Sequence, residues 1–378
     1  MALSPSPLRG EGWDEGALPE AAYINALLSD LELSLPDIWG RKIHAIFFGG
    51  GTPSLFSAEG IDRILTGVRT LAPLLPGAEI TLEANPGTVE AAKLKGFREA
   101  GITRVSLGIQ SFNPRLLQAL GRIHDREEAI RAAELAARHF DTFNLDLMFA
   151  LPGQTLDEAM QDVSAALTFN PPHLSCYQLT LEPNTPFGHT APPNLPDDDL
   201  AADMQLAIEA RLTEAGMQHY ETSAYSRPSH ACSHNLNYWQ FGDYLGIGAG
   251  AHSKLSFHDR ILRRMRIKHP QQYMAAVNSL PPEGGGLERG WRSPFIAEER
   301  KLARQDMPFE FMMNALRLTG GVDAGLFEER TGLPLIVCAE AFKQAQAKGL
   351  LEQDISRLKP TVQGQHFLND LLEIFLPG

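Results

Sequence analysis

Residues 43–52, IHAIFFGGGT, run from a short apolar strand into three glycines and a threonine. Further strand-like runs follow along the chain, and the segments after them show the apolar period of an amphipathic helix. The predicted strands are 43–48, 79–84, 103–109, 142–149 and 174–180. Short apolar strands that alternate with helices predict parallel βα units, so the sequence indicates an α/β fold of the barrel type.

Polar residues and glycines gather directly after each of the first four strands. The segments are 49–52, 85–87, 110–113 and 151–154. In parallel α/β barrels the loops at the carboxyl ends of the strands build the ligand site. Strand-terminating turns are the plainer interpretation of any one segment, but four polar segments in series favour a cofactor site.

Two local features carry chemistry of their own. Successive glycines at 49–51 let backbone groups approach a ligand closely. No lysine follows as in a P-loop, and no GxGxxG spacing is present, which disfavours nucleoside triphosphates and dinucleotides. Asp146 lies inside the apolar run NLDLMF, where a carboxylate is costly unless it is paired, so we interpret it as a functional residue.

The composition narrows the classes of function. The chain has 378 residues, 43% of them hydrophobic, and a formal net charge of −13, which argues against unselective binding of nucleic acid. Its dispersed cysteines, Cys176, Cys232 and Cys338, predict reduced thiols without a disulfide framework. No apolar run approaches the ~20 residues of a membrane span, and no signal segment opens the chain, so we expect a cytoplasmic protein.

Four parts of the chain differ in composition. We expect a disordered Pro/Gly/Ser-rich start, a barrel, a glycine-rich linker and a helical, winged-helix-like C-terminal domain. The expected bounds are 1–16, 17–280, 281–296 and 297–378. We also expect a helix at 18–35 and short strands at 350–352 and 358–361. Acidic residues outnumber basic ones in the C-terminal part, which favours a structural or partner-docking role over contact with DNA.

Six blocks resemble, in the same order, the signature blocks of HemW-type haem chaperones of the radical S-adenosylmethionine (SAM) superfamily. They are FFGGGTPS (47–54), EANPG (83–87), RVSLGIQSFN (104–113), GRIH (121–124), NLDLMFALPGQT (144–155) and HNLNYW (234–239). FMMNALRL at 311–318 resembles the accessory domain of this family and of oxygen-independent coproporphyrinogen III oxidases. The resemblance implies a (β/α)6-type barrel that binds haem and transfers it to an acceptor protein.

The resemblance also implies a SAM site. The residues at the matching positions are Gly50, Gly51, Thr52, Glu83, Gln110, Arg122 and Asp146. By this resemblance the glycines and the threonine contact the aminoacyl end of SAM, and Glu83 contacts its amino group or its ribose. Asp146 suits the ribose hydroxyls, and Arg122 suits the SAM carboxylate.

For haem, the resemblance implicates the HNLNYW block. We expect His234 to be the axial ligand, since neutral imidazole is a common ligand of haem iron. Tyr238 and Trp239 offer flat apolar surface for the porphyrin. The competing ligands are Cys232, His230 and His252. A histidine among aromatic residues is also compatible with a satisfied core residue.

One part of the family pattern is missing. In the family a strand of the type LYxHxPxC leads into CxxxCxxC, whose thiolates bind three irons of a 4Fe–4S cluster. Here MALSPSPLRGEGWDEG precedes the expected helix. We therefore expect an incomplete barrel, weakened SAM binding and no radical chemistry by the usual route. We interpret the chain as a truncated or wrongly started reading frame, with a cluster-free haem carrier as the second hypothesis.

Two other functions stay open. One is an oxygen-independent coproporphyrinogen III oxidase that acts by radical decarboxylation, and the other is a transcriptional regulator that acts through the C-terminal domain. The HNLNYW block favours the chaperone over the oxidase, and the acidic C-terminal domain disfavours the regulator. A homodimer is also left open.

Overall fold

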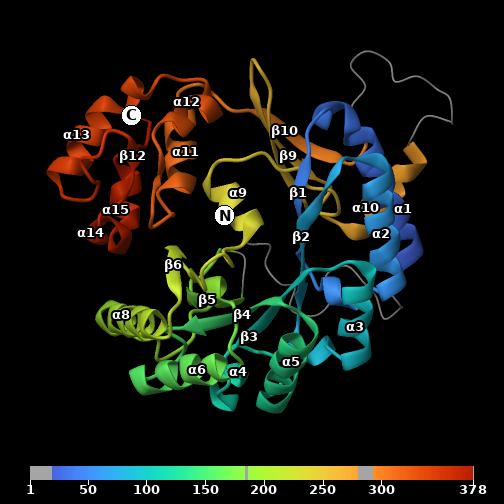
Figure 1. The fold of residues 1–378 in the computed structure, drawn as a ribbon, viewed down its shortest axis with the longest axis horizontal. Coiled ribbons are helices and arrows are strands. Elements are labelled where there is room, and N and C mark those ends of the chain that lie inside the picture. The colour runs from blue at the N-terminus through green and yellow to red at the C-terminus, as the bar shows by residue number, and fades with distance from the viewer. Residues whose placement is uncertain (1–18, 184–185, 280–292, 378) are drawn as a thin grey trace. The chain divides into compact units, whose positions relative to one another are not determined.

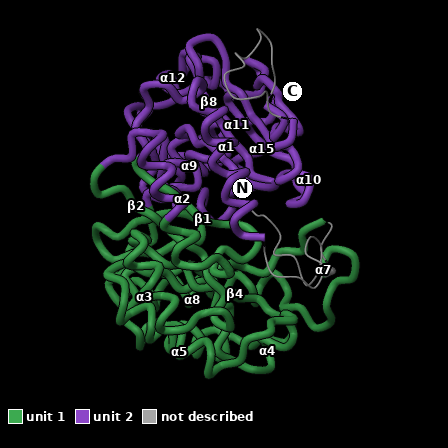
Figure 2. The backbone as a smooth tube through the Cα atoms, turned by 90° about the vertical axis from the view of Figure 1, so that its right-hand side faces the viewer, with its two compact units in different colours: residues 1–11, 44–62, 76–232 green, residues 12–43, 63–75, 233–378 purple. Residues whose placement is uncertain are grey.

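A computed structural model describes residues 19–183, 186–279 and 293–377 (Figure 1). Within these ranges the chain forms two compact units, coloured green and purple in Figure 2. Unit 1 includes residues 44–62 and 76–232, and unit 2 includes residues 63–75 and 233–378 together with the N-terminal helix. The start expected to be disordered, 1–16, and most of the expected linker, 281–296, lie outside the described residues.

Unit 1 is built on a seven-stranded sheet with the order β1-β2-β3-β4-β5-β7-β6. Its strands are β1 (Ile43–Phe48), β2 (Leu74–Ala84), β3 (Arg104–Gln110), β4 (Thr142–Phe149), β5 (His173–Gln178), β6 (Gln218–Glu221) and β7 (Ala224–Ser226). Neighbours from β2 to β5 pair in parallel, whereas β7 and β6 pair antiparallel. The sheet is a curled half-barrel, which confirms the predicted α/β fold with an incomplete barrel.

Strand β3 shows how the two faces of this sheet differ. Val105, Leu107 and Ile109 are each 0% exposed, and they alternate along the strand with Arg104 and Ser106. Successive side chains of a strand point to opposite faces, so one face of the sheet is apolar and the other carries polar groups. The polar face is where the expected cofactor residues lie.

Helices cover the outer face of the sheet (Figure 1). The helices after β2 are α3 (Ala91–Ala100), α4 (Pro114–Ala119), α5 (Arg126–His139), α6 (Leu156–Thr168), α7 (Pro186–His189) and α8 (Asp198–Glu214), of which α5, α6 and α8 pack against β4. Helix α6 begins with a capping box, in which Thr155 and Glu158 each accept a backbone N–H of the other. This cap fixes where the loop after β4 ends.

Unit 2 joins the N-terminal helix α1 (Glu20–Ser34) to the part of the chain after residue 232. Its first elements are η1 (Leu35–Ile38), α9 (Ser233–Trp239), α10 (Pro270–Ala275), η4 (Ala276–Ser279) and an antiparallel sheet of β8 (His252–Ser256), β9 (Ile261–Arg266) and β10 (Ile296–Lys301). Helix α2 (Ala58–Leu71) has residues in both units. Helix α1 confirms the helix predicted at 18–35, and it packs against α10.

The C-terminal part of unit 2 is helical, as predicted. It holds α11 (Met307–Ala315), β11 (Val322–Asp323), α12 (Gly325–Thr331), η5 (Leu335–Cys338), α13 (Ala339–Ala347), β12 (Arg357–Leu358), α14 (Val362–His366) and α15 (Leu368–Glu373). Strand β12 pairs with β11, and the segment expected as a strand at 350–352 forms only a bridge from Leu351 to Pro360. Two-residue strands are too short to show an alternating period, so β11 had no signal in the sequence.

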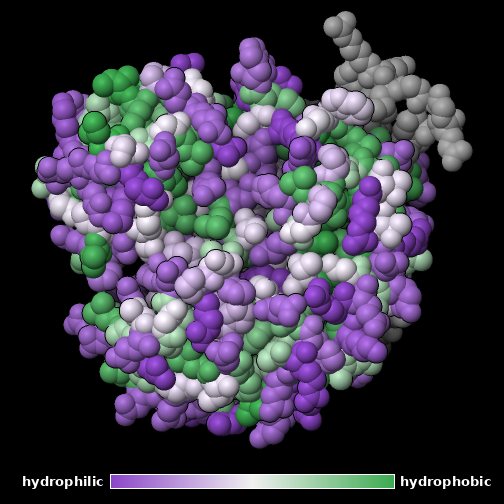
Figure 3. Space-filling view, in the orientation of Figure 1, coloured by the Kyte–Doolittle hydropathy of each residue, from purple (hydrophilic) through white to green (hydrophobic). Residues whose placement is uncertain are grey.

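The surface in Figure 3 mixes hydrophilic and apolar residues. Large apolar side chains such as Ile355, 92% exposed, and Trp39, 87% exposed, point into solvent. Isolated exposed apolar side chains are usual on proteins and indicate no particular partner. Among the described helices, none is long and apolar enough to cross a membrane.

Candidate functional site

The glycine turn after β1 presents its backbone to the end of the sheet. Gly50 and Gly51 have φ angles of 81° and 62°, a left-handed region that favours glycine. The Gly50 N–H donates to Glu83 Oε2 at 3.3 Å. Thr52 follows, half-buried, and precedes the short helix η2 (Pro53–Leu55). The turn therefore lies beside the carboxyl end of β2, as the sequence predicted.

The surroundings of Glu83 favour its protonated form. Burial and, to a smaller extent, repulsion from Asp146 raise its pKa to about 7, against the opposing effect of the Gly50 N–H. The Gly50 contact is the one hydrogen bond of the Glu83 side chain among the described residues. A half-buried carboxyl group with so few partners would gain from a neighbouring cation.

Asp146 on β4 is held by neighbouring strands. It accepts hydrogen bonds from Asn144 Nδ2 at 2.8 Å and Ser106 Oγ at 3.1 Å. Burial raises its pKa, while these donors and the charge of Arg104 oppose the shift. A separate donor thus binds each carboxylate oxygen and fixes the orientation of the group, while each oxygen can still accept from a ligand hydroxyl.

The hydrogen bonds of Asn144 extend this polar face across the sheet. Its Oδ1 lies 2.7 Å from His173 Nδ1 and accepts from Ser175 Oγ at 3.1 Å. His173 Nε2 lies 2.9 Å from the Tyr220 hydroxyl. This network was not predicted from the sequence, although Asn144 stands two residues before Asp146 on the same face of β4, and the alternation of a strand indicates that pairing.

Gln110 and Arg122 complete the set expected from the resemblance. Gln110 ends β3 with a φ of 67°, and the two residues after it donate to Asp162, whose pKa is raised to about 6 by burial. Burial lowers the pKa of Arg122, and the charge of Asp146 opposes that shift. Neither side chain hydrogen-bonds to any described residue, so an amide and a guanidinium remain available to a ligand.

These residues fit SAM in chemistry and in place. In unit 1 the glycine turn, Glu83 and Gln110 lie at the carboxyl ends of β1, β2 and β3, where α/β folds bind their ligands. Asp146 lies within β4, and Arg122 follows α4. SAM carries an ammonium, a carboxylate and two ribose hydroxyls. The site offers two carboxyl groups and one guanidinium, and no ion pair within 4 Å joins any of the three to another described residue, which matches that set of groups.

The cysteines do not fit a 4Fe–4S cluster. Cys176 lies buried within β5, and burial raises the pKa of its thiol. Cys232 is buried and donates to Glu79 at 3.5 Å. Cys338, in unit 2, has its pKa raised to about 11 by burial. Cluster ligands are thiolates grouped on one loop, whereas these three cysteines are buried and dispersed along the chain.

His234, the expected haem ligand, lies on helix α9 in unit 2. Its half-buried ring meets the ring of Tyr238 edge-on, with centroids 6.2 Å apart. Arg317 stacks over the ring of Trp239 at 4.4 Å. Every residue of α9 keeps some exposure to solvent, so His234 is not a fully buried core residue.

Each competing ligand has a different setting. Cys232 is buried in unit 1, while His252 is exposed at the start of β8. His230 is half-buried after β7. Of the three histidines, His234 is the one that a helix presents among aromatic rings.

Comparisons with known proteins identify the family. The model of the radical SAM superfamily matches residues 35–166, and that of the HemN C-terminal domain matches 302–367. "Heme chaperone HemW" of Escherichia coli K12 is 45% identical over 364 residues, which cover 96% of this chain and 92% of that protein. This chain belongs to the HemW family. The HemW of Haemophilus influenzae is 46% identical over 365 residues, which cover 95% of this chain and 91% of that protein.

A solved structure supports the fold assignment of this HemW-family chain. The coproporphyrinogen III oxidase HemN from Escherichia coli, described as a radical SAM enzyme, superimposes with a TM-score of 0.77 at 22% identity. The match covers 96% of this chain and 84% of HemN. At this identity the likeness shows a shared fold, which includes the half-barrel sheet and the helical C-terminal domain.

Proposed function

We propose that this chain is a haem chaperone that binds haem and passes it to an acceptor protein. The observation that carries the proposal is its identity of 45% and 46%, over about its whole length, to two proteins named heme chaperone HemW. The alternative, a coproporphyrinogen III oxidase, has a likeness of fold at 22% identity in its favour. The sequence similarity therefore favours the chaperone.

We also propose that unit 1 holds SAM at the ends of its strands. Glu83 would face the ammonium group, Arg122 the carboxylate, and Asp146 the ribose hydroxyls, with the N–H groups of the glycine turn beside them. SAM bound to a reduced cluster supplies radical chemistry in this superfamily. Because the cysteines here do not fit a cluster, we derive no radical step for this chain and keep to binding and orientation.

Replacing His234 with alanine is expected to weaken haem binding by about tenfold or more, since loss of an iron ligand removes a coordinate bond. The measurement is titration of the purified chain with haem, followed by its Soret absorption. His258→Ala is the matched control, because His258 is an exposed histidine of the same unit and is not a candidate ligand. Equal affinities for the wild type and His234→Ala would remove His234 from the site.

SAM is expected to bind this chain at least about tenfold more weakly than it binds a cluster-containing relative, because its bond to cluster iron is absent. Calorimetric titration of both proteins with SAM measures the difference. Asp146→Asn should weaken the remaining binding further, since the ribose hydroxyls lose an ionised acceptor. An affinity equal to that of the relative would contradict the expectation.

A further inference from the structure

Helix α9, which carries His234, is packed against the C-terminal domain within unit 2. Arg317, just after α11, stacks over the ring of Trp239 at 4.4 Å. Phe311 of α11 meets Phe241 edge-on, with centroids 5.7 Å apart. These contacts place α11 beside the segment that holds the proposed haem ligand.

A second set of contacts leads from His234 to Arg263. The ring of Tyr238, one helical turn after His234, meets the ring of Tyr244 edge-on at 4.7 Å. Arg263 of β9 donates through Nη1 to the hydroxyl of Tyr244 at 2.8 Å. Edge-on aromatic pairs depend on the orientation of both rings, so a hydrogen bond that fixes Tyr244 also limits Tyr238.

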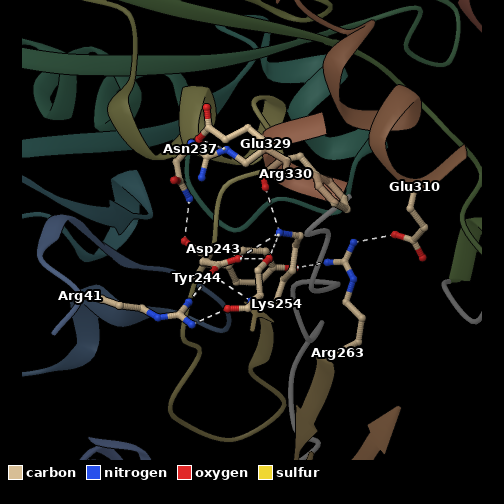
Figure 4. A network of polar contacts seen from close by, with 11 residues as sticks. Arg41, Asn237, Asp243, Tyr244, Lys254, Arg263, Glu310, Glu329 and Arg330 are labelled. Carbon is tan, nitrogen blue, oxygen red and sulfur yellow. Dashed lines mark hydrogen bonds and ion pairs between the residues drawn. The ribbon is translucent and has the colours of Figure 1, made fainter. Parts of the chain in front are cut away.

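Glu310 of α11 fixes the other side of the Arg263 guanidinium. Arg263 Nη2 donates to Glu310 Oε2 at 2.6 Å, and Figure 4 shows Arg263 between Tyr244 and Glu310. The two charged side chains are only 20% and 13% exposed, so water competes little for their hydrogen bonds. A planar guanidinium held at two nitrogens has a fixed plane, which makes it a rigid support for the tyrosine.

The backbone of Tyr244 is held independently of Arg263. Its N–H donates to the Lys254 carbonyl at 2.9 Å, and its carbonyl accepts from the Lys254 N–H at 3.0 Å. Lys254 Nζ in turn donates to Asp243 Oδ1 at 3.0 Å. Loss of the Arg263 hydrogen bond should therefore release the Tyr244 ring without opening the loop that carries it.

We propose that Arg263 and Glu310 are positioning residues that link the C-terminal helical domain to His234. They hold Tyr244, and through it Tyr238, in the arrangement that aims the imidazole of His234 at haem iron. The inference rests on the proposed haem site. It assigns to the C-terminal domain a part in setting how strongly haem is held.

The test compares haem affinity and the electron paramagnetic resonance spectrum of bound ferric haem among variants of the full chain. Arg263→Gln and Tyr244→Phe are each expected to weaken haem binding about fivefold to tenfold and to shift the spectrum toward that of His234→Ala. Arg263→Lys, which keeps the charge toward Glu310 without the planar fork, should restore part of the affinity.

Arg300→Gln is the matched control. Arg300 donates to the other oxygen of Glu310 at 3.2 Å but is 54% exposed, whereas the hydroxyl of Tyr244 accepts from Arg263. It should leave affinity and spectrum unchanged. The double variant Arg263→Gln/Tyr244→Phe should have the same haem affinity as the single variant that binds haem less tightly, because both changes remove the same hydrogen bond.

Hydrogen exchange of residues 233–245 in the haem-free chain gives a second measurement. Exchange should be faster in Arg263→Gln than in Arg300→Gln. If the wild type and His234→Ala bind haem with equal affinity, His234 is not the haem ligand, and the positioning role of Arg263 and Glu310 is rejected as well. If they differ, but Arg263→Gln and Tyr244→Phe match the wild type in affinity, spectrum and exchange, only the inference is wrong.

Discussion

Arg266→Met is expected to lower the free energy of unfolding of unit 2 by about 3–5 kcal/mol. Arg266 on β9 and Asp30 on α1 are both 0% exposed, and Arg266 Nε donates to both carboxylate oxygens, at 3.0 and 2.9 Å. Tyr273 also donates to Asp30, at 2.8 Å. Removing the arginine leaves a buried carboxylate whose remaining partner carries no charge, which is the costly case for a buried pair.

Two further variants separate charge from packing in this prediction. Asp30→Leu combined with Arg266→Met removes both charges, and it should recover most of the lost stability because apolar groups replace the pair. Arg98→Met is the exposed control. Arg98 pairs with Asp141, which is 93% exposed, so this change should cost at most about 1 kcal/mol. Urea unfolding followed by circular dichroism measures all three, and a cost for Arg266→Met equal to that of Arg98→Met would contradict the argument.

The same ion pair shows why the sequence predicts some features and not others. The strands at 43–48 and 142–149 agree with the sequence prediction at both ends, because the spacing of apolar residues within a segment indicates which of its side chains are buried. That spacing does not indicate which distant residue a side chain contacts. Asp30 and Arg266 are 236 residues apart, and nothing in either segment indicates that they meet.

The candidate site divides in a similar way. The family blocks indicate Glu83, and a carboxylate inside an apolar run also indicates Asp146; the structure has Glu83 near the carboxyl end of β2 and Asp146 within β4. The supporting contacts were not predicted, because they join distant segments: His173 to Tyr220, and Arg263 to Glu310. Residues that contact a ligand can be recognised from a local motif. The residues that orient them come from distant segments and are brought together only when the chain folds.

Glu83→Gln is expected to stabilise the chain above neutral pH while it weakens SAM binding. The pKa of Glu83 is raised from 4.5 to about 7 in the folded protein. Between these values the folded state holds a proton that the unfolded state releases, so the stability from Glu83 is present below pH 4.5 and lost as pH rises through 7. Glutamine does not titrate, and its advantage over the wild type should reach about 2–3 kcal/mol at pH 8.

The binding of SAM should respond in the opposite direction. An ionised Glu83 attracts the ammonium of SAM, so wild-type affinity should rise between pH 6 and 8, whereas Glu83→Gln should bind about tenfold more weakly at pH 8 with a flatter profile. Glu134→Gln, an exposed change on α5 of the same unit, should alter neither quantity. If Glu83→Gln gains stability and loses affinity for SAM, then the buried carboxyl group of Glu83 costs stability and serves ligand binding. If Glu83→Gln lost stability at pH 8, Glu83 would instead be a structural residue that supports the glycine turn.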